Sequence, residues 1–267
     1  MPEGPEVRIT ATQLNDLLAE KTLQELNFVD GKYTMSNPDG YAEFDLLTPT
    51  RIKSVNCKGK TLYFTFESLE DGKKHYAFHS LMMSGRWTRS WDKYCKWYIE
   101  TTCGTTIWFS DPRAIGTIRF TSSHQEFERT LDRLGPDVLS PELTTLVFKN
   151  LCRKYSNRNI TSFLMDQQVL AGIGNYLKAE ILYASCIAPT RKVSSISQEE
   201  VLRLLSSIRT LSREALAAKG MTLRDYASPD GNDGGYQFSL KVYGKKGATR
   251  LKTADGRITY WDPKKQK

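Results

Sequence analysis

Residues 166–180 have the sequence DQQVLAGIGNYLKAE, and this segment decides how the second half of the chain is organised. Gly172 and Gly174 stand one residue apart at the start of a predicted helix over residues 174–185. Because glycine lacks a Cβ atom, the backbone here can approach a phosphate, which would meet free amide donors and the positive end of the helix dipole. Asn175 would add a side-chain donor. A tight turn between two helices is the simpler explanation of an isolated G-x-G segment, so both alternatives stay open.

Helical periodicity dominates on both sides of this segment. It predicts helices over residues 125–134, 143–153, 159–170, 174–185 and 198–218. Residues 228–235, SPDGNDGG, form a flexible loop by composition. Two short strands are predicted after this loop, over residues 237–243 and 257–261, with a Gly- and Lys-rich connection between them.

The first half of the chain has a different pattern. After an amphipathic helix predicted over residues 6–20, short β-rich runs are separated by Gly and Asp breaks. The predicted strands are residues 22–29, 52–57, 61–66, 75–81, 96–102, 105–109 and 117–121. Strands followed by helices predict an α+β chain whose first domain is a sandwich or barrel, with a boundary near Gly135-Pro136.

Charge and cysteine content restrict the function. The 267 residues include 38 Lys+Arg and 30 Asp+Glu, and the net charge of +8 suits a polyanionic partner such as nucleic acid. The five cysteines contain no C-x-x-C pair, which predicts reduced thiols and no thiolate metal site. Neither a signal peptide nor a membrane span is apparent, so we expect a soluble intracellular protein. The lysine-rich tail, residues 263–267, is either a solvated end or an aid to nuclear import.

The amino terminus, MPEGPE, has the composition of a nucleophilic site. Removal of Met1 would leave Pro2 as a secondary amine, and α-amino groups titrate close to neutral pH. Such an amine can attack an electrophilic carbon while a neighbouring carboxyl group, Glu3 or Glu6, transfers protons. For six isolated residues, an ordinary start of translation is the simpler explanation.

Five segments in order along the chain resemble one family, that of formamidopyrimidine-DNA glycosylase and endonuclease VIII. They are MPEGPEV, CKGKTLYF around Lys60, LMMSGRW around Met83, DPRAIG around Arg113, and DQQVLAGIGNYLKAEILY. The resemblance implies an N-terminal β-sandwich with a flanking helix, then a helix-two-turn-helix domain with a finger hairpin. It divides the chain into residues 1–134, 135–235 and 236–267. The implied activity is excision of oxidised bases and cleavage of the abasic site.

The resemblance also implies catalytic roles. Pro2 is the nucleophile that attacks C1′ of the damaged nucleotide, forming a Schiff base, and Glu3 is its acid and base partner. Lys60 supplies a positive charge and a proton, whereas without the resemblance a solvated strand-end lysine is the simpler interpretation. Glu6 contacts the lesion or moves a proton. Arg257 reaches a phosphate from the finger and assists the second of the β- and δ-elimination steps.

A second group of residues is implied to bind damaged DNA, duplex or single-stranded, through base extrusion. Gly174 and Asn175 contact the backbone, while Met83 and Arg113 fill the gap that the extruded nucleotide leaves. Several members carry Phe where this chain has Ile115, which offers no aromatic face for stacking. The alternative interpretation of Met83 is a methionine of the hydrophobic core.

The finger segment VYGKKGATRLKTADGRITYW lacks the four cysteines of zinc-bearing members, so it resembles the zincless finger of endonuclease VIII-like enzymes. Neither metal nor cofactor is expected, and we expect a monomer. TLRDY at residues 222–226 resembles formamidopyrimidine-type members, whereas the terminus resembles endonuclease VIII, so the preferred lesion stays open. The alternative function is that of a non-enzymatic DNA-binding protein. The localisation implied is a nucleus or another DNA-containing compartment.

Overall fold

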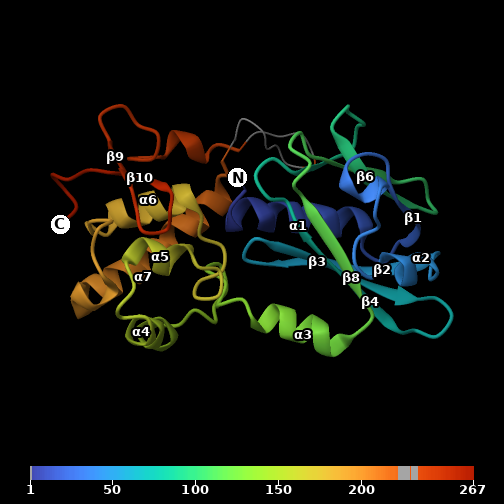
Figure 1. Cartoon of the computed structure of the whole chain (residues 1–267), viewed down its shortest axis with the longest axis horizontal. Coiled ribbons are helices and arrows are strands. Elements are labelled where there is room, and N and C mark those ends of the chain that lie inside the picture. Colours follow the sequence, from blue (N-terminus) through green and yellow to red (C-terminus); the bar gives the residue numbers. More distant parts are fainter. Residues whose placement is uncertain (1, 222–228, 230–233) are drawn as a thin grey trace. The chain divides into compact units, whose positions relative to one another are not determined.

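The computed structural model describes residues 2–221, 229 and 234–267, and its contacts divide the chain into two units. The first contains Pro2 and Glu6–Asp132, and the second contains Glu3–Pro5, Arg133–Met221 and Gly235–Lys267 (Figure 1). The predicted roles of Met1, of residues 222–226 and of most of the 228–235 loop lie outside the described residues. The three-domain boundaries stay a prediction, but the grouping of Glu3–Pro5 with the second unit bears directly on the site.

The first unit is built around antiparallel strands. Its elements are α1 (Gly4–Leu18), whose first two residues belong to the second unit, β1 (Thr22–Phe28), η1 (Lys32–Thr34), α2 (Tyr41–Asp45), β2 (Thr50–Lys58), β3 (Thr61–Ser68), β4 (Lys74–Ser80), β5 (Arg86–Thr88), β6 (Cys95–Thr101), β7 (Thr106–Ser110), β8 (Thr117–Thr121) and α3 (His124–Asp132). The described strands follow the order β5-β7-β6-β1-β2-β3-β4-β8.

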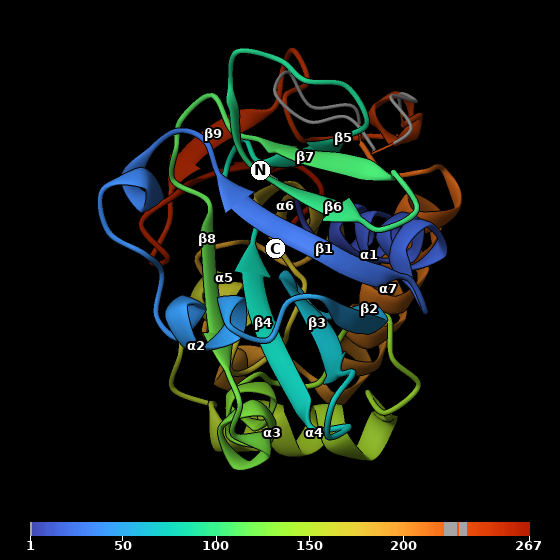
Figure 2. The same ribbon diagram turned by 90° about the vertical axis from the view of Figure 1, so that its right-hand side faces the viewer.

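The sheet of the first unit divides into two halves at β1. This strand pairs with β6 along most of its length, but with β2 only through Thr22 and Leu23. The halves β5-β7-β6-β1 and β2-β3-β4-β8 therefore run in different directions, as Figure 2 shows. Because the inner faces of both halves bury apolar side chains against each other, the β-sandwich prediction is confirmed.

The core of the sandwich follows the alternation of side chains along each strand. In β3, Leu62, Phe64 and Phe66 are buried while their neighbours are partly exposed. Helix α1 covers this core with one stripe of apolar residues at helical spacing: Val7, Ala11, Leu14 and Leu18. The predicted strands correspond to observed ones, with small shifts at their ends. The short elements α2 and β5 were not predicted, because three to five residues show little periodicity.

The second unit is mainly helical. It contains α4 (Thr145–Lys154), α5 (Ile160–Met165), α6 (Asn175–Ala184), η2 (Val193–Ser195), α7 (Gln198–Ala217), η3 (Tyr236–Phe238), β9 (Thr249–Lys252) and β10 (Ile258–Trp261). Side chains cap the helix starts: Thr144 caps α4, Asn159 caps α5, and Ser197 forms a capping box with Glu200 at α7. The α+β class is thereby confirmed.

The helix predicted over residues 159–170 was too long, since α5 ends at Met165. The side chain of Gln167 explains this end. Its amide donates to the carbonyl oxygens of Met165 and Ile173 at 2.9 and 3.0 Å, and its oxygen accepts the Gly172 N–H at 3.0 Å. A side chain that satisfies these backbone groups stabilises a compact turn instead of a continued helix.

The strand predicted over residues 237–243 was wrong. Residues Tyr236–Phe238 form the short helix η3. The strand that pairs with β10 is instead β9, which lies inside the segment expected to be a connection. The backbone N–H groups of Lys241, Val242 and Tyr243 donate to the Glu180 carboxylate at 2.7–2.9 Å. Because one carboxylate takes three successive donors, these residues do not use them in a strand ladder.

The carboxyl-terminal tail is not a fully solvated end. Gln266 is buried, and its side-chain amide donates to the Ile187 carbonyl at 2.9 Å. The backbone of Lys267 pairs with that of Cys186 and Ala188 at 3.1 Å. These bonds attach the tail to the loop after α6, a long-range contact that a charged composition does not indicate.

Candidate active site

The Glu3 carboxylate is held at the start of α6. It accepts the backbone N–H groups of Gly174 at 2.6 Å, Tyr176 at 2.9 Å and Leu177 at 3.2 Å. The free N–H groups and the positive dipole end of a helix make this a favourable position for an anion. Glu3 is only 2% exposed, so the three bonds fix both its place and its orientation.

Gly174 is required by the closeness of Glu3. A Cβ atom on Gly174 would lie 2.2 Å from Glu3 Cδ, far inside normal contact distance. The G-x-G segment therefore brings a backbone against a negatively charged group, as its composition indicates, but here that group is a carboxylate of the same chain. The DNA contact of Gly174 stays a prediction.

A buried ion pair joins α6 to the β9–β10 hairpin. Lys178 Nζ lies 2.6 Å from Asp255 Oδ2, and the two side chains are 0% and 4% exposed. Burial lowers the pKa of Lys178, and the attraction of Asp255 offsets this only in part. Burial acts to raise the pKa of Asp255, but hydrogen bonds from Lys178 and Thr253 hold it below its ordinary value.

Two further side chains of α6 bind the segment that contains the hairpin. Glu180 accepts the three N–H groups described above, and Asn175 Nδ2 donates to the Ile258 carbonyl at 3.1 Å. Figure 1 shows α6 beside this hairpin within the second unit. Tyrosine rings fill the space between them, with centroid distances of 5.2–6.3 Å for the pairs Tyr176–Tyr236, Tyr176–Tyr243 and Tyr243–Tyr260.

Arg257 follows the turn that contains Asp255. The turn is closed by the Thr253 N–H, which donates to the Arg257 carbonyl at 2.9 Å, and Gly256 adopts a left-handed φ of 78°. Arg257 itself is exposed. The second unit thus brings together Glu3, Gly174 and Asn175 at one helix end, and holds the turn before Arg257 against the same helix.

The first unit contains the other predicted catalytic residues. Pro2 is buried, and Glu6 is fully buried in the first turn of α1, where its carbonyl accepts the Thr10 hydroxyl. Lys60 is partly exposed in the tight turn between β2 and β3, in which Gly59 has a φ of 57°. The catalytic roles of these residues stay predictions.

Asp111 organises the two loops that contain the predicted wedge residues. Its Oδ1 accepts the Ser84 hydroxyl at 2.5 Å and the Arg113 N–H at 3.1 Å. Its Oδ2 accepts the N–H groups of Ile115 and Gly116 at 2.8 and 2.7 Å. This fully buried carboxylate therefore fixes the loop of Arg113 and Ile115 and attaches it to the residue after Met83.

The wedge residues differ in exposure. Arg113 is exposed and Ile115 is 36% exposed, whereas Met83 is only partly exposed. Its neighbour Met82, which the sequence did not single out, is 41% exposed and has a left-handed φ of 55°. The apolar side chain presented by this loop is therefore more accessible at Met82 than at Met83.

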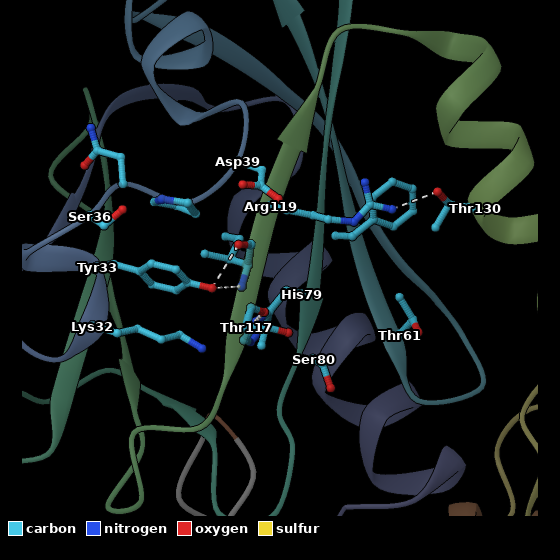
Figure 3. A pocket seen from close by; sticks show the side chains of 14 residues that line it. Lys32, Tyr33, Ser36, Asp39, Thr61, His79, Ser80, Thr117, Arg119 and Thr130 are labelled. Carbon is cyan, nitrogen blue, oxygen red and sulfur yellow. Dashed lines mark hydrogen bonds between the residues drawn. The ribbon is translucent and has the colours of Figure 1, made fainter.

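A separate cavity of about 620 Å³ lies in the first unit between the segment around Tyr33 and strands β4 and β8 (Figure 3). The Tyr33 hydroxyl bridges the N–H and carbonyl of Ile118 at 3.2 Å. Arg119 covers the Phe78 ring at 4.5 Å and also contacts Glu126 and Thr130. None of the predicted site residues lines this cavity.

Among the described residues, no group of three His, Cys, Asp or Glu side chains has the geometry of a metal site. The same part of the chain contains no helix of sufficient length and apolar character to cross a membrane. The five cysteines are free thiols.

The structure adds four residues that sequence reasoning missed: Asp111, Lys178, Glu180 and Asp255. All four are charged side chains with little or no exposure, paired with groups far away in sequence or with the backbone of a loop. The only sequence signal was that two of them, Lys178 and Glu180, interrupt an otherwise apolar helix, which favours a partnered role for a buried charge.

The fold thus combines a β-sandwich with a mainly helical unit whose hairpin is bound by one helix. Residues 1–118 match the formamidopyrimidine-DNA glycosylase N-terminal domain, and residues 134–227 match the formamidopyrimidine-DNA glycosylase H2TH domain. Formamidopyrimidine-DNA glycosylase of Listeria innocua serovar 6a is 30% identical over 254 residues, which cover 92% of this chain and 90% of the relative. That of Bacillus cereus (strain ATCC 10987 / NRS 248) is 31% identical over 255 residues, covering 92% and 89%. The chain belongs to the formamidopyrimidine-DNA glycosylase family, with its endonuclease VIII-like members.

Solved structures agree in fold. The MutM (Fpg) protein of Thermus thermophilus aligns with a TM-score of 0.85 at 29% identity, over 99% of this chain and 98% of that one. A Lactococcus lactis Fpg bound to DNA that contains an abasic site aligns with a TM-score of 0.85 at 23% identity, over 99% of both chains. At that identity, the second likeness shows the fold alone.

Proposed function

We propose that this protein is a base-excision repair DNA glycosylase that also cleaves the abasic site it creates. The single observation that carries the proposal is the position of Glu3, the residue after Pro2 in sequence, whose carboxylate is held by three amides at the start of α6. A nucleophilic amine needs a fixed acid–base partner, and the chain supplies one at the adjacent residue. Family membership supports the same reaction class.

In the proposed reaction, the Pro2 nitrogen bonds to C1′ of the damaged nucleotide while the glycosidic bond breaks and the base leaves. Glu3 transfers the proton that accompanies opening of the sugar ring, which gives an iminium adduct. Loss of a C2′ proton then breaks the C3′–O3′ bond, and a second elimination breaks the C5′–O5′ bond. Lys60 supplies positive charge near the sugar, and Arg257 binds a phosphate during the second elimination.

The proposed substrate is damaged DNA. The net charge of +8 favours the phosphate backbone, and the relatives named above are glycosylases of formamidopyrimidine. We propose ring-opened purines and oxidised pyrimidines as the main lesions. Since Ile115 cannot stack like an aromatic ring, we expect the preference for duplex over single-stranded DNA to be small. A panel of single-lesion oligonucleotides in both forms tests this; strong activity only on oxidised guanine opposite cytosine contradicts it.

Borohydride trapping tests the mechanism. Protein shown by intact mass to lack Met1 is mixed with abasic-site DNA and reduced; we expect a covalent complex through Pro2. Pro2→Gly replaces the secondary amine with a primary amine, so trapping should fall. Pro2 behind an unprocessed Met1 is part of an amide and should not trap at all. If processed wild-type protein binds DNA but is never trapped, the chain is a non-enzymatic DNA-binding protein instead.

A further inference from the structure

We infer that Lys178 and Asp255 are positioning residues for Arg257. Their buried ion pair fixes the finger turn against α6, and thereby the location from which Arg257 acts in the second elimination. The inference rests on the proposed function and assigns the reaction step that this pair controls. The chain places these two charges where stability alone does not favour them.

Lys178 is in an unfavourable place for a cation. It is the fourth residue of α6, so its charge lies near the positive end of the helix dipole, where anions are favoured. It is also completely buried, which removes the ammonium group from water. An apolar residue of similar length would fill the same space without either cost, and replacement of a buried ion pair by apolar residues is often neutral or stabilising. The pair is therefore better explained by the geometry it imposes than by stability.

The ion pair acts on a rigid turn. The Asp255 carboxylate accepts the Thr253 hydroxyl, and Thr253 in turn contacts the Thr259 hydroxyl at 2.7 Å. The Gly256 N–H donates to the Thr253 carbonyl at 2.9 Å. Since Arg257 is two residues after Asp255 inside this closed turn, a displacement of Asp255 moves the Arg257 backbone as well.

The other connections between α6 and the finger do not involve the turn residues before Arg257. Glu180 binds residues 241–243, well before the hairpin, and Asn175 binds the carbonyl of Ile258, the residue after Arg257. Zinc-bearing fingers fix such a hairpin through metal ligands, whereas this finger contains no cysteine. Within the described residues, the Lys178–Asp255 contact is the one ion pair between α6 and the turn that precedes Arg257.

The three backbone bonds that hold Glu3 lie at the start of α6 and involve neither Lys178 nor Asp255, although the negative charge of Glu3 acts to raise the pKa of Lys178. Loss of the pair should consequently separate the reaction steps. Formation of the Schiff base and the first elimination should remain, while the second elimination loses a correctly placed guanidinium. Misplacement of a positioning group by about 1 Å can reduce a rate by ~100-fold.

The test uses the full chain and the double variant Lys178→Met/Asp255→Asn, which removes both charges and leaves no unpaired buried ion. Asn at position 255 retains an acceptor for Thr253. On abasic-site duplex DNA we expect trapping within about twofold of wild type and a ~10- to 100-fold fall in the rate of δ-elimination, measured from the ratio of unsaturated aldehyde to phosphate ends. Arg257→Ala should give the same ratio, and combining it with the double variant should add nothing further.

The control is Arg191→Met/Glu200→Gln, which removes a partly exposed ion pair of the second unit with a 2.6 Å contact, together with the bonds of Arg191 to Ser195 and Lys267. Thermal unfolding of all variants is measured in parallel. An unchanged product ratio in the double variant, or an equal loss of trapping and of both eliminations, overturns the inference. The inference is also overturned if the rate reductions caused by the double variant and by Arg257→Ala multiply when the two are combined. Failure of wild-type protein to trap abasic DNA instead overturns the proposed function, so the two failures are distinguishable.

Discussion

The Glu3 carboxylate occupies the space that a side chain on Gly174 would need: a Cβ atom there would lie 2.2 Å from Glu3 Cδ and 2.3 Å from Oε1. The amino terminus and α6 are therefore complementary surfaces, 171 residues apart in sequence. A substitution at Gly174 disturbs this contact. Its effects on stability and on Schiff-base trapping, measured separately, distinguish a role of the turn in folding from a role of Glu3 in the chemistry.

Gly174→Ala should displace Glu3 from its three amide donors. Overpacking of a tightly packed site costs ~1–3 kcal/mol, so we expect this loss in the free energy of unfolding, measured with urea. Schiff-base trapping should fall ~100-fold, because a misplaced acid–base group no longer meets the reacting sugar. Gly235→Ala is the stability control, since its Cβ would meet nothing closer than 3.7 Å. Full trapping by Gly174→Ala would show that the position of Glu3 is not critical.

Asp111→Asn should loosen the loop of Arg113 and Ile115. The NH2 group of asparagine, which replaces one carboxylate oxygen, cannot accept hydrogen bonds, so N–H groups such as those of Ile115 and Gly116 lose their acceptor. We expect a loss of ~1–3 kcal/mol in stability and weaker binding of duplex DNA with an abasic site, measured by fluorescence anisotropy. Binding of single-stranded DNA should change less, because no opposite strand needs to be held apart. Equal losses for both DNA forms would contradict this role of the loop.

His79 should make stability depend on pH below neutrality. It is fully buried among aromatic rings, and burial lowers its pKa to about 4. The unfolded chain, with a histidine pKa near 6.5, binds a proton that the folded chain rejects. The free energy of unfolding should therefore decrease by ~3 kcal/mol as pH falls from about 6.5 to about 4.

The control for this effect is His79→Asn, whose Nδ2 takes the position of His79 Nδ1 and retains a donor for the Thr117 carbonyl, which His79 Nδ1 contacts at 2.8 Å. Its stability should decline less steeply over the same pH range when urea unfolding is compared at matched salt. Parallel pH profiles for the variant and the wild type would assign the acid sensitivity to other groups.

Cys103 should be the thiol that reacts first with alkylating reagents. It is exposed, and hydrogen bonds from Thr101 and Thr105 lower its pKa to about 7. By contrast, burial raises the pKa of Cys152 to about 11. Since the thiolate is the reactive form, iodoacetamide should modify Cys103 half-maximally near pH 7, as followed by peptide mass spectrometry. Modification of Cys152 at a similar rate in native protein would contradict the structure.

The periodic parts of this chain were predictable from the sequence. Strand alternation such as that of Leu62, Phe64 and Phe66, and the α1 stripe of Val7, Ala11, Leu14 and Leu18, depend on local geometry alone. The predicted helix start at Gly174 was correct to one residue. Where side chains of distant residues supplied hydrogen bonds, as Glu180 does for residues 241–243, the prediction of a strand was wrong.

By itself, the sequence determined the α+β class and the order of the segments. It also showed that the finger segment contains no cysteine and that the proline–glutamate terminus matches a recognisable family pattern. Only the tertiary structure decided that Glu3 fills the Gly174 turn and that Lys178 meets Asp255. The physical reason is that alternation and helical spacing are set by neighbouring residues, whereas the partner of a buried charge is set by which distant groups the fold brings within hydrogen-bond distance.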